Sequence, residues 1–313
     1  MKLLLHGSFT VLLLCGGALA QTAAITLAGQ GGYRTPPLAL TAAPGQVLVL
    51  HVFGLTAGNF NQVVATPQDG EFPKVLNGIS VDLVEGAKTT SLPIRAIYQG
   101  YCGQTGDCST LTGITLQMPF ELTASPQSGK LPALRVSENG KPAGGVLLRV
   151  VPDNVHVLNT CDDTQIYVSA AYSVPQDVCA SVVMHDGKLN SLYNVARGGQ
   201  EVALWAYGLG AKTEQSAQCC NSPEQFAKPV QPFKLNFTFG ANVPPTRALT
   251  GVGLTADPSF AAYVGGGMYQ LNFALPAVPA DLPACDGVKV KSNLTITVTG
   301  TSSEDAAQIC VTP

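Results

Sequence analysis

The chain has 313 residues, of which 46% are hydrophobic and 12% are charged, and its formal net charge at pH 7 is -3. Phosphate binding requires clustered lysines and arginines, so this sparse and slightly acidic charge excludes a basic nucleic-acid face. At this length the chain can form two domains, each with its own hydrophobic core.

The first twenty residues have the pattern of a secretory signal. One lysine precedes an apolar stretch over residues 3–14, and the small-residue segment 18–20 (ALA) follows. We therefore expect residues 1–20 to be a cleaved signal peptide and the protein to be secreted or held at the cell surface. Cys15 raises the alternative of a lipid anchor, but the residue before a lipidated cysteine is normally small and Leu14 is large. No later stretch reaches the roughly 20 apolar residues of a membrane span.

Two sequence markers are repeated in the same order. Residues 45–55 (GQVLVLHVFGL) recur 154 positions later as residues 199–209 (GQEVALWAYGL). Residues 114–119 (ITLQMP) recur at a spacing of 157 as residues 271–276 (LNFALP). Repeated markers at nearly one offset indicate a duplicated domain.

The duplication predicts domain boundaries and a fold class. We expect one domain over residues 21–151, a connector over 152–180 and a second domain over 181–313. Both halves consist of short candidate strands separated by turn-forming residues. The chain has 33 Gly and 22 Pro and no long helical pattern. This composition favours an all-β protein of two tandem immunoglobulin-like β-sandwiches.

The predicted strands follow the repeat. In the first half they cover residues 47–53, 79–84, 92–97, 114–120 and 146–151, and in the second half 201–207, 235–239, 269–275 and 289–298. Asn77-Gly78 and Asn139-Gly140 tolerate the positive φ angles of tight hairpin turns. Apolar and polar residues alternate in 289–298, which predicts one packed face and one wet face. Asn236 and Asn293 begin glycosylation sequons, but both lie inside predicted strands, so we expect them to be polar positions on a sheet surface.

The cysteine count indicates disulfides. Eight of the nine cysteines follow the signal sequence, and an even number in an exported chain predicts a disulfide set. They are Cys102, Cys108, Cys161, Cys179, Cys219, Cys220, Cys285 and Cys310. Sequence proximity favours the pairs Cys102–Cys108, Cys161–Cys179 and Cys285–Cys310. Cys219 and Cys220 are left as a strained vicinal bridge or as partners of other cysteines or other chains. A zinc site lacks the paired C-x-x-C spacing.

Four motifs of the second half occur in order. They are residues 182–187 (VVMHDG), 199–210 (GQEVALWAYGLG), 256–263 (ADPSFAAY) and 269–276 (YQLNFALP). With these motifs the second half resembles the Solibacter-type uncharacterised C-terminal domain family, exported bacterial domains akin to immunoglobulin-like IPT/TIG modules. The first half looks like a divergent copy. The resemblance implies an extracytoplasmic β-sandwich that serves as an accessory or adhesion-like module, and it supplies no catalytic residues.

Catalytic motifs are absent from the sequence. It contains neither a G-x-S-x-G elbow nor an H-E-x-x-H pair. His51 lies in the repeated strand at the position of Trp205 in the other copy, which favours a packing or sheet-surface role, and His185 precedes an Asp-Gly turn. Adjacent acidic residues such as Asp162-Asp163 point to opposite sides of a strand and lack the ligand spacing of a calcium site. We expect no enzymatic activity, no metal and no cofactor.

Aromatic side chains are the best candidates for ligand contact, because sugar rings stack on flat side chains. Trp205 and Tyr207 lie two positions apart and share a strand face that we expect to be core. Tyr98 and Tyr101 lie beside the predicted Cys102–Cys108 loop, and loops at the ends of a sandwich commonly carry binding sites. This pair is the predicted ligand-binding site.

The predicted function is that of an exported, non-catalytic structural or binding protein with an adhesion-like role at the bacterial cell surface or outside it. The first alternative is a carbohydrate-binding accessory module, which requires exposed coplanar aromatics. The second is a secreted hydrolase, which requires histidine and carboxylates to converge from both halves. The expected partners are an extracellular polysaccharide or a surface protein, because an exposed sheet edge can accept a strand from another chain.

Overall fold

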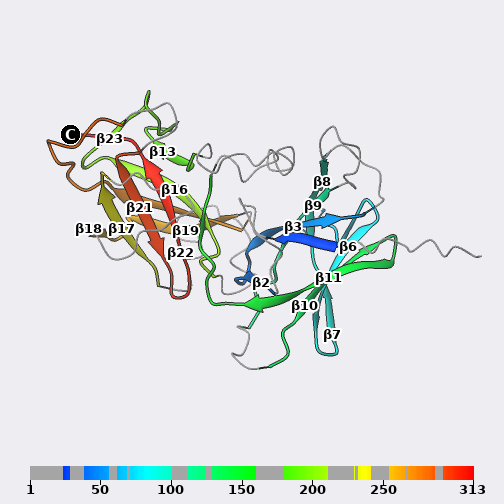
Figure 1. The fold of residues 1–313 in the computed structure, drawn as a ribbon. Helices are drawn as coiled ribbons and strands as arrows, with labels where there is room; N and C mark the ends of the chain where they lie inside the picture. The colour runs from blue at the N-terminus through cyan, green and yellow to red at the C-terminus, as the bar shows by residue number, and fades with distance from the viewer. Residues whose placement is uncertain are drawn as a thin grey trace, which may run out of the picture.

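The structure is a computed structural model, and the residues that it describes form mainly β-strands. The described residues are 24–28, 39–55, 62–68, 71–100, 111–123, 129–159, 180–210, 229, 232–240, 254–265, 267–285 and 292–313. Within these ranges the chain forms two separate β-sandwiches (Figure 1) and no helix. The prediction of an all-β chain with two tandem immunoglobulin-like sandwiches is confirmed. None of these residues belongs to a helix that has the length and hydrophobicity to cross a membrane.

The first sandwich packs two sheets face to face. One sheet has the order β1-β3-β9-β8-β4, with β1 Ala24–Ala28, β3 Val47–Phe53, β9 Leu111–Gln117, β8 Ile94–Gly100 and β4 Val63–Val64. The other has the order β2-β11-β10-β6-β5 with β7 beside β6, comprising β2 Ala39–Ala42, β11 Lys141–Val150, β10 Ala133–Glu138, β6 Ile79–Glu85, β5 Val75–Leu76 and β7 Lys88–Ser91. These orders place β1, β3, β9 and β8 at strands A, B, E and D of an immunoglobulin sandwich, opposite the sheet that contains C, F and G.

The second sandwich repeats this topology. One sheet has the order β14-β13-β16-β20-β19 with β12 beside β16, comprising β12 His156–Val157, β13 Val183–His185, β14 Lys188–Leu189, β16 Glu201–Tyr207, β20 Met268–Ala274 and β19 Phe260–Gly265. The facing strands are β18 Leu254–Ala256, β17 Lys234–Phe239, β21 Leu294–Thr299 and β22 Glu304–Ile309 in one sheet, and β15 Ala196–Arg197 with β23 Val311–Thr312 in another. β15 runs parallel to β23, as β2 runs parallel to β11 in the first sandwich.

The repeated strand has one register in both copies. β3 pairs with β9 over seven successive residues that begin with Val47 opposite Gln117. β16 pairs with β20 over seven successive residues that begin with Glu201 opposite Ala274. These starting pairs are related by the same two sequence spacings as the repeated motifs. The similarity of the two halves therefore extends to strand pairing.

The turn before the repeated strand is also closed in the same way in both copies. The Oε1 atom of Gln46 accepts a hydrogen bond from the backbone N–H of Ala43 at 2.9 Å, and Gln200 accepts one from Arg197 at 2.6 Å. In each case the glutamine N–H donates back to the carbonyl of the same partner. This side-chain cap satisfies a backbone donor that the turn leaves unpaired.

Local turn chemistry sets the predicted hairpins. Asn77-Gly78 has φ angles of 48° and 76°, and Asn139-Gly140 has φ angles of 50° and 76°. Both pairs connect antiparallel neighbours, β5 with β6 and β10 with β11. Positive φ at both central residues is the geometry that matches the twist of the flanking strands, so these two predictions are confirmed.

The predictions that β21 has one wet face and that Asn293 lies on a sheet surface are both wrong. Thr295 and Thr297 are each only 1% exposed, so both faces of β21 are buried. The strand lies between β17 and β22, and its polar face is covered rather than wet. Asn293 is also buried, and its side-chain amide bonds the backbone N–H and carbonyl of Val311 at 2.8 and 2.7 Å. Its amide completes backbone pairing and does not lie on the sheet surface.

A short segment joins the two sandwiches, and Asn154 contacts both of them. Its backbone N–H donates to the carbonyl of Gly208 in the second sandwich at 2.7 Å. Its side-chain Nδ2 donates to the carbonyl of Thr41 and to Oε1 of Gln46 in the first sandwich, both at 3.1 Å. We call residues 153–155 the joint. Directly after it, β12 pairs with β16 at the edge of the second sandwich.

Asp153 anchors the joint in the turn between β21 and β22. Its fully buried carboxylate accepts backbone hydrogen bonds from Thr301, Ser302 and Ser303 at 2.8 to 3.1 Å, together with the hydroxyls of Thr301 and Ser303. Burial opposes ionisation, but hydrogen bonds from Thr301, Ser303 and Ser302 outweigh it and hold the pKa of this carboxyl below its ordinary value. The next residue, Val155, donates its N–H to the Ser303 hydroxyl at 2.6 Å.

Apolar contacts extend the junction. Phe120 of the first sandwich packs against the second core and meets the Tyr263 ring edge-on, with centroids 6.0 Å apart. The Tyr263 hydroxyl accepts from the backbone N–H of Gly267 at 3.0 Å and from Nε2 of Gln117 at 3.5 Å. Gly267 has φ of +81°, and a Cβ there would lie 2.6 Å from Cγ2 of Val47. Glycine is thus required both by the backbone angle and by the close approach of the first sandwich.

The two turn glutamines provide a matched test of the joint. We expect Gln46→Ala to lower the free energy of unfolding of the whole chain by about 2 kcal/mol, because it leaves the buried N–H of Ala43 without its partner and removes the contact of Gln46 with Asn154. Gln200→Ala removes the same cap where water can replace it, so its cost should be well under half as large. Urea unfolding of both variants measures the difference, and equal losses would contradict the role of Gln46 in joining the sandwiches.

Asp153→Asn tests the anchor. The amide keeps the shape but turns an NH₂ group toward donors that had an ionised acceptor, so we expect a loss of about 3 kcal/mol in unfolding free energy at pH 7. The control is Asp82→Asn, because Asp82 is only partly buried and its carboxylate accepts a hydrogen bond from the Ser91 hydroxyl at 2.6 Å. A loss for Asp153→Asn no greater than that of the control would show that the anchor contributes little.

Candidate functional site

Of the predicted tyrosine pair, the structure describes one residue, Tyr98. Tyr98 lies on β8 opposite Gly113, half-buried, with its hydroxyl 3.2 Å from Oγ1 of Thr115 on β9. Tyr101 lies outside the described residues. Tyr98 is therefore attached to the sheet through its hydroxyl, and the pairing of the two rings stays a prediction.

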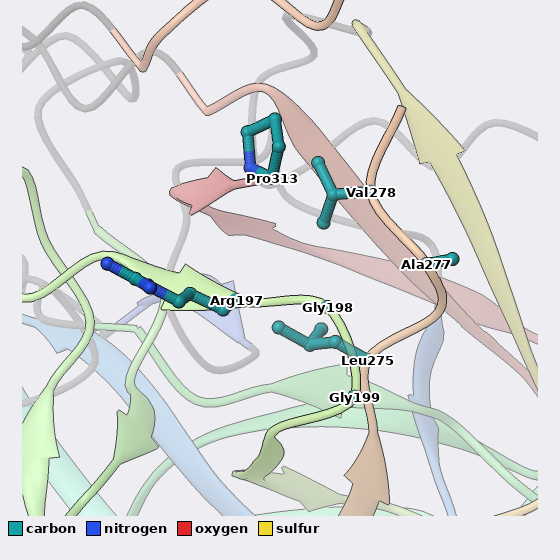
Figure 2. Close-up of a pocket in the computed structure, with 7 residues that line it drawn as sticks. All are labelled: Arg197, Gly198, Gly199, Leu275, Ala277, Val278 and Pro313. Carbon is teal, nitrogen blue, oxygen red and sulfur yellow. The ribbon is translucent and has the colours of Figure 1, made fainter. Parts of the chain in front are cut away.

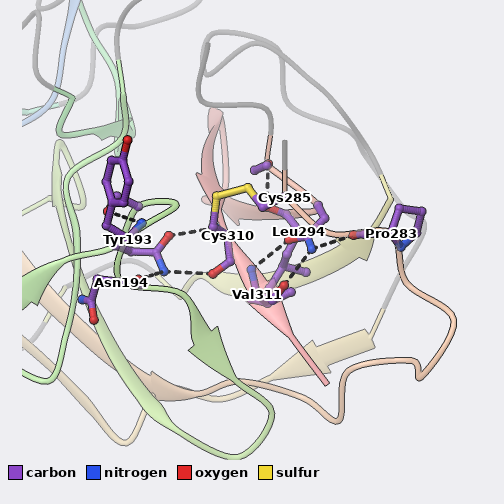
Figure 3. Close-up of a disulfide and its surroundings, with 11 residues drawn as sticks. Tyr193, Asn194, Pro283, Cys285, Leu294, Cys310 and Val311 are labelled. Carbon is purple, nitrogen blue, oxygen red and sulfur yellow. Dashed lines mark hydrogen bonds between the residues drawn. A yellow bond between two sulfur atoms is a disulfide. The ribbon is translucent and has the colours of Figure 1, made fainter. Parts of the chain in front are cut away.

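One of the three favoured cysteine pairs lies within the described residues. Cys285 and Cys310 form a disulfide with a Cα–Cα distance of 5.4 Å (Figure 3). Backbone groups of Cys310 are held by the side chain of Asn190, which accepts from its N–H at 2.8 Å and donates to its carbonyl at 2.9 Å. The bridge therefore fastens the end of β22 to the loop before β21. The other candidates lie outside the described residues: Cys102, Cys108, Cys161, Cys179, Cys219 and Cys220.

Two of the histidines have structural roles. His51 is 5% exposed in the middle of β3, and burial lowers its pKa to about 4. His156 lies with Nδ1 3.0 Å from Oδ2 of Asp305, and its ring stacks on Tyr207 at 6.4 Å. Asp305 also accepts the backbone N–H of Val157 at 2.9 Å, which ties the edge strand β12 to β22. In the described ranges, no three His, Cys, Asp or Glu side chains lie close enough together to hold a metal ion.

Trp205 and Tyr207 lie on the outer face of β16, so the expectation that they are core residues is wrong. The strand residues that alternate with them point into the core: Val202, Leu204 and Ala206 are each at most 1% exposed. Because successive strand residues point to opposite faces, Trp205 and Tyr207 face away from that core and are only partly buried. Both faces of this strand carry apolar residues, and Glu201 at its start is the sequence signal that marks the outer one.

A hollow of about 300 Å³ lies beside Trp205 on this outer face. The small side chain of Ala203 forms its floor, between the larger side chains of Glu201 and Trp205 on the same strand. Met184 on β13 lies opposite Ala203 and bounds the hollow on that side. His185, the last residue of β13 before the Asp-Gly turn, also lines it. The hollow exists because one small residue is surrounded by large ones.

Polar side chains on β20 continue this surface. Gln270, opposite Trp205, donates its Nε2 hydrogen to Oδ1 of Asn272 at 2.8 Å. Asn272 in turn lies 3.4 Å, through Nδ2, from Oε1 of Glu201, and the Ser259 hydroxyl donates to Oε2 of Glu201 at 3.0 Å. We call Gln270, Asn272 and Glu201 the polar row. Its hydrogen bonds orient the Glu201 carboxylate beside the hollow before any ligand is present.

The first sandwich has no open counterpart of this face. The positions equivalent to Glu201, Ala203 and Trp205 are occupied by Val47, Val49 and His51. All three are buried, with exposures of 5%, 6% and 5%. Of the two repeated strands, the one in the second copy has the open outer face.

A second hollow, of about 550 Å³, lies at the turn before β16, where Gly198 and Gly199 face Leu275, Val278 and Pro313 (Figure 2). The equivalent turn of the first copy, at Gly45, is buried against the second sandwich. Figure 2 shows the Arg197 side chain extending away from Ala277 and Val278. The walls are thus glycine backbone and aliphatic side chains. The hollow beside Trp205 combines an aromatic ring with oriented polar groups, and it is the candidate site.

No protein-family profile and no curated protein matches the chain. Among solved structures, it is similar to the adhesin FdeC of Escherichia coli, with 11% identity, a TM-score of 0.25, and coverage of 93% of this chain and 63% of that one. It is similar to the adhesin InvE of Yersinia pseudotuberculosis at 12% identity and a TM-score of 0.20, over 88% of this chain and 56% of that one.

A further similar structure is the complex of Dpr2 Ig1-Ig2 with DIP-Theta Ig1-Ig3, at 12% identity and a TM-score of 0.22, over 88% of this chain and 94% of that one. The chain spans less than two thirds of the length of the two adhesins. The immunoglobulin-like fold follows from the strand order of the two sandwiches themselves.

Burial of His51 predicts a pH dependence of stability. Its pKa is about 4 in the folded chain against an ordinary 6.5, so between these values the unfolded chain binds one more proton. The contribution of His51 to the free energy of unfolding is fully present above pH 6.5, and about 3 kcal/mol of it is lost when the pH is lowered to 4. Urea unfolding from pH 7.5 to 4 measures the slope.

The variant His51→Gln should flatten that slope, whereas the control Asp257→Asn, which removes an exposed carboxyl, should leave it unchanged. A slope that survives His51→Gln would assign the pH dependence to other groups.

Proposed function

We propose that the chain is an exported, non-catalytic binding protein with an adhesion-like role at the bacterial cell surface or outside it. The observation that carries this proposal is the open outer face of the second sandwich, where Trp205 lies beside a hollow and a pre-oriented polar row. The joint supports the same role, because it attaches this face to a second folded domain through partly buried hydrogen bonds.

The chemistry of the described residues favours binding over catalysis. Asp153 and His156 take part in the contacts that hold the joint and the edge strand, and His51 is buried within a sheet. A hydrolase would need a histidine and carboxylates that converge from both halves. The titratable groups around the hollow, His185, Asp186 and Glu201, all come from one sandwich.

Export is supported by two observations of different kinds. Residues 1–20 have the pattern of a secretory signal, and the Cys285–Cys310 disulfide suits an oxidising compartment. The resemblance of the second half to the Solibacter-type C-terminal domain family belongs to the same proposal, because that family consists of exported bacterial domains.

Retention on surfaces tests the proposal. The full chain, produced in an oxidising compartment, is incubated with bacterial envelopes and with insoluble polysaccharides, and both the bound protein and any released soluble fragments are measured. We expect saturable retention on at least one surface with no release of fragments. Release of sugars or peptides would show a catalytic protein, and no retention on any surface would remove the binding role.

A further inference from the structure

We propose that the hollow over Ala203 binds a neutral saccharide, with one pyranose ring stacked on Trp205 and its hydroxyls bonded to the polar row. This inference rests on the proposed binding function and names the ligand class for it. The site differs from the Tyr98 and Tyr101 pair that the sequence favours, since it lies on the second sandwich.

Trp205 supplies the flat surface that the proposal requires. Its ring lies on the outer face of β16, only partly buried, and lines the hollow. Aliphatic C–H groups on one face of a pyranose pack favourably against an indole, whose N–H can also donate a hydrogen bond. Ala203 leaves the space in which that sugar ring would lie.

The polar row supplies complementary hydrogen bonds. Each oxygen of Glu201 has a single partner among the described residues, Asn272 on one side and Ser259 on the other. An ionised carboxylate has about four lone-pair sites, so Glu201 retains acceptor capacity for sugar hydroxyls. Hydrogen bonds to a charged acceptor are the stronger kind, and those already formed hold this acceptor in place.

The charges that line the hollow favour a neutral sugar over an acidic one. Two carboxylates, Asp186 and Glu201, line the hollow, and among its described lining residues there is neither lysine nor arginine. An acidic sugar would meet repulsion from both. The row of amides beside Trp205 provides both donors and acceptors, which matches the alternating demands of sugar hydroxyls better than those of a simple organic cation.

Trp205 also provides the readout, because it is the only tryptophan of the chain. The full chain is titrated with neutral oligosaccharides of glucose, xylose, mannose and N-acetylglucosamine, with an oligogalacturonate as the acidic probe and a lysine tripeptide as the cationic probe. We expect at least one neutral oligosaccharide to change the tryptophan emission saturably, and the acidic and cationic probes to have no effect.

Two variants that keep Trp205 locate the response. Ala203→Leu fills the hollow from the outer face, and we expect it to raise the apparent Kd for the saccharide by about tenfold or more. Tyr193→Ala removes a side chain that is 98% exposed and does not line the hollow, so its Kd should match that of the parent chain. Circular dichroism and urea unfolding confirm that both variants are folded.

The inference is overturned if no neutral oligosaccharide changes the emission, if only the lysine tripeptide does, or if Ala203→Leu binds as tightly as the parent. Retention of the full chain on envelopes without any saccharide response would leave the proposed binding function intact and remove the saccharide. Loss of both retention and response would remove both.

Discussion

The buried carboxylate of Asp153 is the interaction on which the arrangement of the two sandwiches depends. A charge with no solvent exposure is stable only where donors surround it, and here three backbone amides and neighbouring hydroxyls of residues 301–303 do so. The anchor fixes the start of the second sandwich to its own last hairpin. Asn154, the next residue, then reaches back to Thr41 and Gln46. Two consecutive side chains thus connect both folded units.

The junction also explains why two copies of one strand pattern have different surfaces. Val47, at the start of the first copy, is buried near Gly267 of the second sandwich, whereas the equivalent Glu201 is exposed and bonded to Ser259. His51 is buried where Trp205 lines an open hollow. The shared backbone registers preserve the fold in both copies. Substitutions on the outer face leave one copy for attachment and leave the other copy open, where we propose that a ligand binds.

Features that depend on local sequence could be predicted, and features that depend on distant contacts could not. Repeated apolar segments bounded by turn-forming residues located β3 and β16, and Asn-Gly pairs located two hairpins, because these signals lie within a few residues. The sequence does not predict the outer position of Trp205, because both faces of β16 carry apolar side chains and alternation alone does not say which face is core. The anchor of Asp153 joins residues separated by 148 to 150 positions, and no local pattern indicates such a contact.

Differential scanning calorimetry of the full chain tests most directly whether the two sandwiches form one unit through the joint. Unfolding of the second sandwich would expose Phe120 and strip Asn154 and Gln46 of their partners, so neither half should unfold alone. The account predicts one transition, with a calorimetric enthalpy equal to the van't Hoff enthalpy. Two separate transitions, each with the enthalpy of one sandwich, would contradict it.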